Sequence, residues 1–131
     1  MIRLEKKESI YFLTMDAEEN RWNTTFVREI ADALDEIEKD EGPGALISSS
    51  TNPKFYSNGL DLDWMQAPEN HPDGGDREVF GEEFMYLMGR FITLPIPTVC
   101  AINGHAFGAG FMFALSHDVR IMREDRGFIC A

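Results

Sequence analysis

Two short segments place small residues where a strand gives way to a helix. The first is FYSNGLDL, residues 55–62, and the second is NGHAFGAGFMFAL, residues 103–115. A strand that enters a helix through a glycine turn leaves backbone N–H groups free at the helix N-terminus, where they favour negative charge. Two such turns aimed at one point would form an oxyanion hole. The spacing alone also fits two ordinary connections, because one Gly-x-Gly pattern is a weak signal.

The surrounding sequence predicts the elements that would hold these turns. Runs 2–7 and 10–15 predict a β-hairpin, and apolar spacing predicts a helix from Thr24 or Thr25, either of which could cap it, towards Asp40. Strands are predicted at ALISSS, PIPTVCAI and DVRIMRE, and helices at residues 79–94 and at FMFALSH. Residues 66–78 predict a mobile loop. The alternation predicts an α/β fold in one domain, residues 1–131.

The last run, GFICA, is apolar and strand-like, and no polar stop follows it. A natural domain rarely ends on an unpaired apolar strand, because such an edge invites aggregation. We therefore expect that the domain is incomplete at its C-terminus, or that this strand pairs with something outside the chain.

Composition argues against several classes of partner. The formal net charge of −11 over 131 residues disfavours nucleic acid and anionic membrane surfaces. No signal peptide and no membrane-spanning run is visible, so we expect a cytoplasmic protein, or a peroxisomal one if a C-terminal signal lies outside this chain. Cys100 and Cys130 lie in apolar runs and are predicted to be buried free thiols.

FYSNGLDL, followed by LPIPTVCAINGHAFGAGFMFALSHDVRIM, resembles the crotonase (enoyl-CoA hydratase/isomerase) superfamily, and within it most resembles the Δ3,Δ2-enoyl-CoA isomerases. The resemblance covers essentially the whole chain, with two separated motifs in the family's order. It implies a ClpP/crotonase-like α/β fold, a spiral of β-β-α units, of which this chain would be the N-terminal half. It also implies an acyl-CoA thioester as substrate, no cofactor beyond the coenzyme A of that substrate, and a homotrimer or hexamer.

The resemblance assigns roles to residues by position. The oxyanion donors would be the backbone N–H groups of Leu60 and Ala109. The residues expected to line the substrate and coenzyme A channel are Trp22, Asn23, Thr24, Ser57, Asn58, Gly59, Asp61, Gly108 and Met112.

The same resemblance bears on the reaction. Met112 stands where hydratases of the family carry a water-activating glutamate, which argues against two-glutamate hydration. Isomerases use one carboxylate that moves a proton from C2 to C4, and the resemblance places it just beyond Ala131. An apolar pocket would raise its pKa, and Phe107, Phe111 and Met112 are candidate walls, although all three also fit the core of a helix or strand.

Other sites fit the residues less well. The side chains of Asp61, Asp63, His71, Asp73 and Asp76 lack a recognised metal spacing, so we expect no metal.

A thiol nucleophile at Cys100 beside His105 is disfavoured, because a buried thiol is inert. We expect His105 to order its turn by a hydrogen bond, and His117 to mark a helix end favoured by the dipole.

The favoured function is conversion of 3-enoyl-CoA to 2-enoyl-CoA. A non-catalytic acyl-CoA-binding or scaffold protein of the same fold and an enoyl-CoA hydratase remain alternatives.

Overall fold

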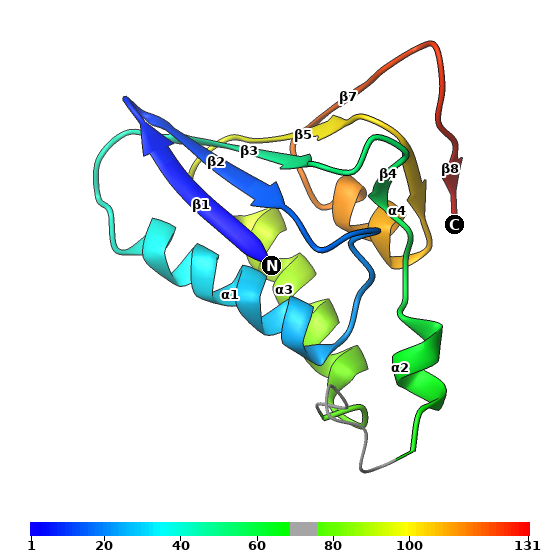
Figure 1. Ribbon diagram of the computed structural model, residues 1–131. Helices are drawn as coiled ribbons and strands as arrows, with labels where there is room; N and C mark the ends of the chain where they lie inside the picture. The colour runs from blue at the N-terminus through cyan, green and yellow to red at the C-terminus, as the bar shows by residue number, and fades with distance from the viewer. Residues whose placement is uncertain (69–75) are drawn as a thin grey trace.

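The chain folds into two β-sheets and four helices over the residues that the computed structural model describes, 1–68 and 76–131 (Figure 1). The larger sheet has the order β1-β2-β3-β5-β7, and the smaller one β4-β6-β8. The larger sheet contains β1 (Ile2–Lys7), β2 (Ile10–Met15), β3 (Ala45–Ser50), β5 (Thr98–Ile102) and β7 (Val119–Met122). The smaller sheet contains β4 (Phe55–Ser57), β6 (His105–Phe107) and β8 (Ile129–Cys130). The helices are α1 (Thr24–Glu38), α2 (Leu62–Gln66), α3 (Phe80–Thr93) and α4 (Ala109–Leu115).

The predicted hairpin at the N-terminus is confirmed. Strands β1 and β2 pair antiparallel from Ile2 opposite Met15 to Lys7 opposite Ile10, and Glu8 takes a positive φ of 57° in the turn. The remaining pairs in both sheets are parallel. Parallel neighbours bring the carboxyl ends of their strands to one edge, which is where the predicted turns begin.

Helices α1 and α3 cover one face of the larger sheet and pack against each other (Figure 1). The apolar spacing of α1 predicted its buried stripe correctly. Its cap was predicted wrongly, because the side chain of Asn23, not Thr24 or Thr25, accepts the hydrogen bond from the Phe26 amide at 2.8 Å. Asparagine is among the best residues at this position, since its oxygen satisfies an otherwise free amide.

Aromatic rings fill the centre of the molecule. Trp22 packs edge-to-face on Phe26, Phe84 and Phe113, with ring centroids 4.7–5.2 Å apart, and Phe91 packs on Phe113 at 4.9 Å. These rings come from the loop before α1 and from α1, α3 and α4. The core therefore joins the helices to the segment that leads into the first glycine turn.

The smaller sheet was not predicted from the sequence. Strands β4 and β6 lie inside the two segments that were interpreted as turns, so the glycine turns follow β4 and β6 and not β3 and β5 directly. Strand β8 pairs with β6 of the same chain, through hydrogen bonds from Ala106 N to Phe128 O and from Gly108 N to Cys130 O. The premise that GFICA is unpaired within the chain is therefore wrong, whereas the expected incompleteness of the domain stays a prediction.

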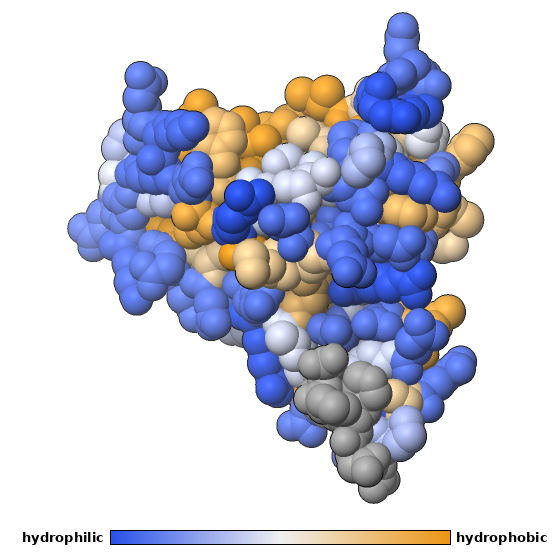
Figure 2. Space-filling view, viewed as in Figure 1, coloured by the Kyte–Doolittle hydropathy of each residue, from blue (hydrophilic) through white to orange (hydrophobic). Residues whose placement is uncertain are grey.

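Apolar surface remains on one edge of the larger sheet. Figure 2 shows it along the top of the view, where Figure 1 has β5 and β7, and Val119 and Ile121 of β7 are exposed.

Cys130 is also exposed, so only Cys100 of the two predicted buried thiols is buried. No helix in the described ranges is long and apolar enough to cross a bilayer. The predicted loop 66–78 falls largely on residues 69–75, which lie outside the described residues.

Candidate active site

The two glycine turns meet backbone to backbone. Gly59, which follows β4, has a φ of 82°, and a Cβ on it would lie 2.8 Å from the carbonyl oxygen of Phe107 and 3.8 Å from the backbone nitrogen of Ala109. A Cβ on Gly110 would lie 2.6 Å from the Oγ of Ser57. Both positions require glycine, because any side chain would push the two turns apart.

The two amides predicted to be oxyanion donors have no acceptor among the described residues. The N–H and C=O of Trp22 bond to Gly59 O and Asp61 N at 2.8 and 2.9 Å, which leaves the amide of Leu60 outside this bridge. Ala109 is the first residue of α4, so its N–H has no acceptor within the helix. In residues 1–68 and 76–131, neither amide donates a hydrogen bond to the protein.

Three predicted channel residues are buried and use their side chains in hydrogen bonds within the protein. The side chains of Trp22, Thr24 and Ser57 are completely buried. Trp22 Nε1 donates to Ser57 Oγ at 3.1 Å, Ser57 Oγ donates to Asn20 O at 2.7 Å, and Thr24 Oγ1 donates to Asp76 O at 2.7 Å. Burial keeps these three side chains from a ligand, so any contact would be made by their backbone, and their predicted place in the channel stays a prediction.

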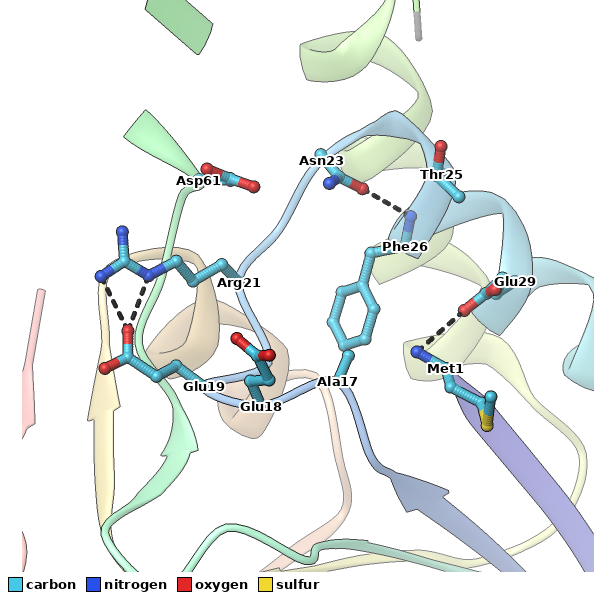
Figure 3. A pocket seen from close by; sticks show the side chains of 10 residues that line it. All are labelled: Met1, Ala17, Glu18, Glu19, Arg21, Asn23, Thr25, Phe26, Glu29 and Asp61. Carbon is cyan, nitrogen blue, oxygen red and sulfur yellow. Dashed lines mark hydrogen bonds and ion pairs between the residues drawn. The ribbon is translucent and has the colours of Figure 1, made fainter. Parts of the chain in front are cut away.

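A pocket of about 250 Å³ opens beside the first turn (Figure 3). Asn23 and Asp61 line it, and both are half-buried. Each is already used as a helix cap, because Asn23 begins α1 and Asp61 Oδ1 accepts from the amide of Trp64 at 3.0 Å in α2. Their predicted contact with coenzyme A stays a prediction.

The charge around this pocket is mainly negative. Its lining holds two cations, each paired with a carboxylate: the guanidinium of Arg21 lies 2.7 Å from Glu19, and the N-terminal ammonium of Met1 lies 3.5 Å from Glu29 (Figure 3). The side chain of Asn58 also donates to Glu19 at 3.0 Å, and this hydrogen bond, followed by that of Arg21, lowers the pKa of Glu19. A carboxylate held in its charged form in this way is a poor proton acceptor for a weakly acidic carbon.

The remaining predicted residues lie around the second turn. Gly108 takes a φ of 49° and precedes Ala109, and Met112 is 41% exposed one helical turn further on. Phe107 and Phe111, the other candidate walls, are half-buried. Their role as an apolar wall stays a prediction.

The rival sites are not assembled among the described residues. No group of metal-binding side chains gathers there, and His71 and Asp73 of the proposed acidic set fall outside the described residues. Burial raises the pKa of the Cys100 thiol to about 11, so it is protonated at neutral pH. His105 Nδ1 accepts a hydrogen bond from the amide of Phe128 at 3.1 Å, which links β6 to the segment before β8; the expectation that His105 orders its own turn stays a prediction.

No role was predicted from the sequence for three buried polar residues near the turns, Asn20, Ser48 and Tyr56. Asn20, with a φ of 54°, donates to Ser50 Oγ and to Tyr56 O and so fixes the loop before α1. Ser48 contacts both the hydroxyl of Tyr56 and the ring of His117. The sequence held one signal for them, because a serine at an inward position of the apolar run ALISSS needs a buried partner.

Known proteins resemble the chain over nearly its whole length. The family model described as enoyl-CoA hydratase/isomerase matches residues 5–130. The chain is 34% identical to the enoyl-CoA delta isomerase 2 of Arabidopsis thaliana, over 98% of this chain and 55% of that protein. It is 34% identical to the Arabidopsis enoyl-CoA delta isomerase 3, over 98% of this chain and 54% of that protein.

Solved structures share the fold. A Pseudomonas aeruginosa structure superposes with a TM-score of 0.83 at 28% identity, over 95% of this chain and 53% of that one. An enoyl-CoA hydratase from Geobacillus kaustophilus superposes with a TM-score of 0.86 at 23% identity, over 98% of this chain and 47% of that one. The chain thus spans about half the length of the relatives that it matches. The predicted crotonase-like α/β fold is confirmed, and the chain belongs to the enoyl-CoA hydratase/isomerase (crotonase) family.

Proposed function

We propose that the protein is an acyl-CoA isomerase that moves the double bond of a 3-enoyl-CoA to position 2, as part of fatty acid metabolism. The observation that carries the proposal is the pair of acceptor-free amides, Leu60 and Ala109, on turns in contact through Gly59. Two such donors on a thioester oxygen stabilise the enolate that forms when a C2 proton leaves. One carboxylate then returns the proton at C4.

In the described part of the chain, two of the carboxylates at the first turn are already engaged by other groups. Glu19 is held by Asn58 and Arg21, and Asp61 caps α2. We propose that the carboxylate lies beyond Ala131, as the resemblance to isomerases implies. We also propose that the substrate needs no separate cofactor and that the protein forms trimers or hexamers.

The resemblance to two named isomerases supports isomerisation, and Met112 supports it over hydration because a thioether cannot activate water.

The test is to incubate the purified protein with a 3-enoyl-CoA and, separately, with a 2-enoyl-CoA, and to separate the products by chromatography. Isomerisation of the first without hydration of the second supports the proposal. Hydration of the 2-enoyl-CoA would favour the hydratase, and binding without either reaction would favour the non-catalytic acyl-CoA-binding protein.

A further inference from the structure

A chain of buried hydrogen bonds runs behind the two turns. The Oγ of Ser48 on β3 lies 2.8 Å from the hydroxyl of Tyr56 on β4 and 2.8 Å from Nε2 of His117. On the other side of the imidazole, Nδ1 lies 2.8 Å from the carbonyl oxygen of Phe113 in α4. Ser48, Tyr56 and His117 are all buried, so water does not compete for these bonds.

The direction of each bond follows from the groups involved. The carbonyl of Phe113 can only accept, so Nδ1 of His117 carries the proton and Nε2 accepts. The hydroxyl of Ser48 must then donate to His117 and accept from Tyr56. Burial lowers the pKa of His117 to about 4 and raises that of Tyr56, so both groups are neutral at pH 7, as this arrangement requires. His117 is thus a neutral acceptor and not a charged group favoured by the helix dipole.

The two ends of this chain of hydrogen bonds lie on the elements that carry the two turns. Tyr56 directly precedes Ser57 in β4, the strand that leads into the turn of Leu60. His117 follows α4, whose first residue is Ala109, and its ring packs on Phe113 within that helix at 4.7 Å. One hydroxyl therefore connects the strand that carries the first amide to the helix that carries the second.

We propose that Ser48 is a positioning residue that fixes α4 relative to β4, and thereby sets the relation between the amides of Leu60 and Ala109. Its effect on turnover rests on the proposed function, whereas its effect on the amides does not. At the front, the turns touch through close contacts at Gly59 and Gly110, which prevent them from approaching further. The hydrogen bonds of Ser48 act behind them and resist rotation or sliding of the helix along the strand.

The consequence for an enzyme would be a loss of rate more than of substrate binding. Donors that are displaced from their best positions lose most of their effect on charge that develops in the transition state. A displacement of about 1 Å can cost about 100-fold in rate. For Ser48→Ala we expect kcat to fall about tenfold, with KM within about twofold, because a neutral thioester oxygen depends less on donor alignment.

The test uses three variants, Ser48→Ala, Tyr56→Phe and the double variant that combines these two changes. Ser49→Ala is the control. Ser49 is the next residue of β3 and is half-buried, so its variant controls for loss of a hydroxyl from the same strand. Two quantities are measured: kcat and KM for a 3-enoyl-CoA, and the backbone amide NMR resonances of Leu60 and Ala109. If the single chain of hydrogen bonds is what matters, the double variant will have the kcat of Ser48→Ala, because both changes break the same link.

The expected result is that Ser48→Ala shifts both amide resonances and lowers kcat, whereas Ser49→Ala does neither. The proposal is overturned if Ser48→Ala leaves both amide resonances unchanged. If Ser48→Ala does not fold, Tyr56→Phe takes its place in this test. The proposal is also overturned if the kcat losses of the two single variants multiply in the double variant. A wild-type protein without isomerase activity would refute the proposed function, while the resonances would still decide the role of Ser48.

Discussion

Replacing Ala109 by proline removes one proposed oxyanion donor with little damage to the fold. Ala109 is the first residue of α4, and its N–H has no acceptor within the described residues. Proline is well tolerated at this position because its fixed φ suits a helix start and the missing N–H is unpaired anyway. We therefore expect the melting temperature of Ala109→Pro to stay near that of the wild type.

The effect on catalysis should be far larger than the effect on stability. Loss of one donor from a two-donor site typically costs about 10²–10³ in rate, which corresponds to about 2.7–4 kcal/mol in the activation free energy. The matched control is Ala109→Gly, which keeps the N–H and should retain kcat/KM within about threefold of the wild type. Steady-state conversion of a 3-enoyl-CoA to the 2-enoyl-CoA measures both variants. A folded Ala109→Pro protein as active as Ala109→Gly would refute the role of this amide.

Three further predictions follow from burial and charge. The pKa of His117 is about 4 in the fold, against an ordinary value of 6.5. Burial is the main cause of this lowering and Arg120 adds to it, whereas the Phe113 carbonyl and Asp118 act in the opposite direction. The unfolded chain therefore binds the proton first, and the free energy of unfolding should fall by up to about 3 kcal/mol as the pH drops from 6.5 to 4. Urea titrations of the wild type and of His117→Gln at several pH values measure this fall. An equal slope of unfolding free energy against pH in both proteins would contradict the prediction. The exposed thiol of Cys130 should react with a chromogenic disulfide under native conditions and that of Cys100 only after unfolding, and equal native rates for both would show that Cys100 is accessible. Because the net charge is −11 and coenzyme A carries phosphates, KM for an acyl-CoA should decrease as ionic strength rises from about 0.01 to 0.15 M, and a KM that increases would show that local cations govern binding.

The proposed oxyanion site is built from backbone and not from side chains. The proposed donors are backbone amides, so side-chain substitutions at Leu60 or Ala109 that keep the N–H should matter less than a proline. The side chains that surround the turns, including Trp22 and Ser57, are buried and serve to hold the backbone. We therefore expect activity to depend on packing behind the turns as well as on residues that touch the substrate.

The sequence by itself determined the elements with a strong local period. Helices α1 and α3 and strands β1, β2, β3 and β5 were predicted because their inward residues recur at 3.6 or 2 positions over several turns or pairs. The family and the two glycine segments also followed from residue order, since glycine at Gly59 and Gly110 is demanded by close backbone contact.

Only the tertiary structure decided how these pieces meet. Strands β4, β6 and β8 are two or three residues long, too short for any period to show, and they form through pairing with each other. The buried hydrogen bonds of Ser48 join residues up to 69 positions apart, a contact that no local pattern contains. The physical reason is that a strand pair or a buried polar bond is specified by its partner, and the partner's position is fixed only when the chain has folded.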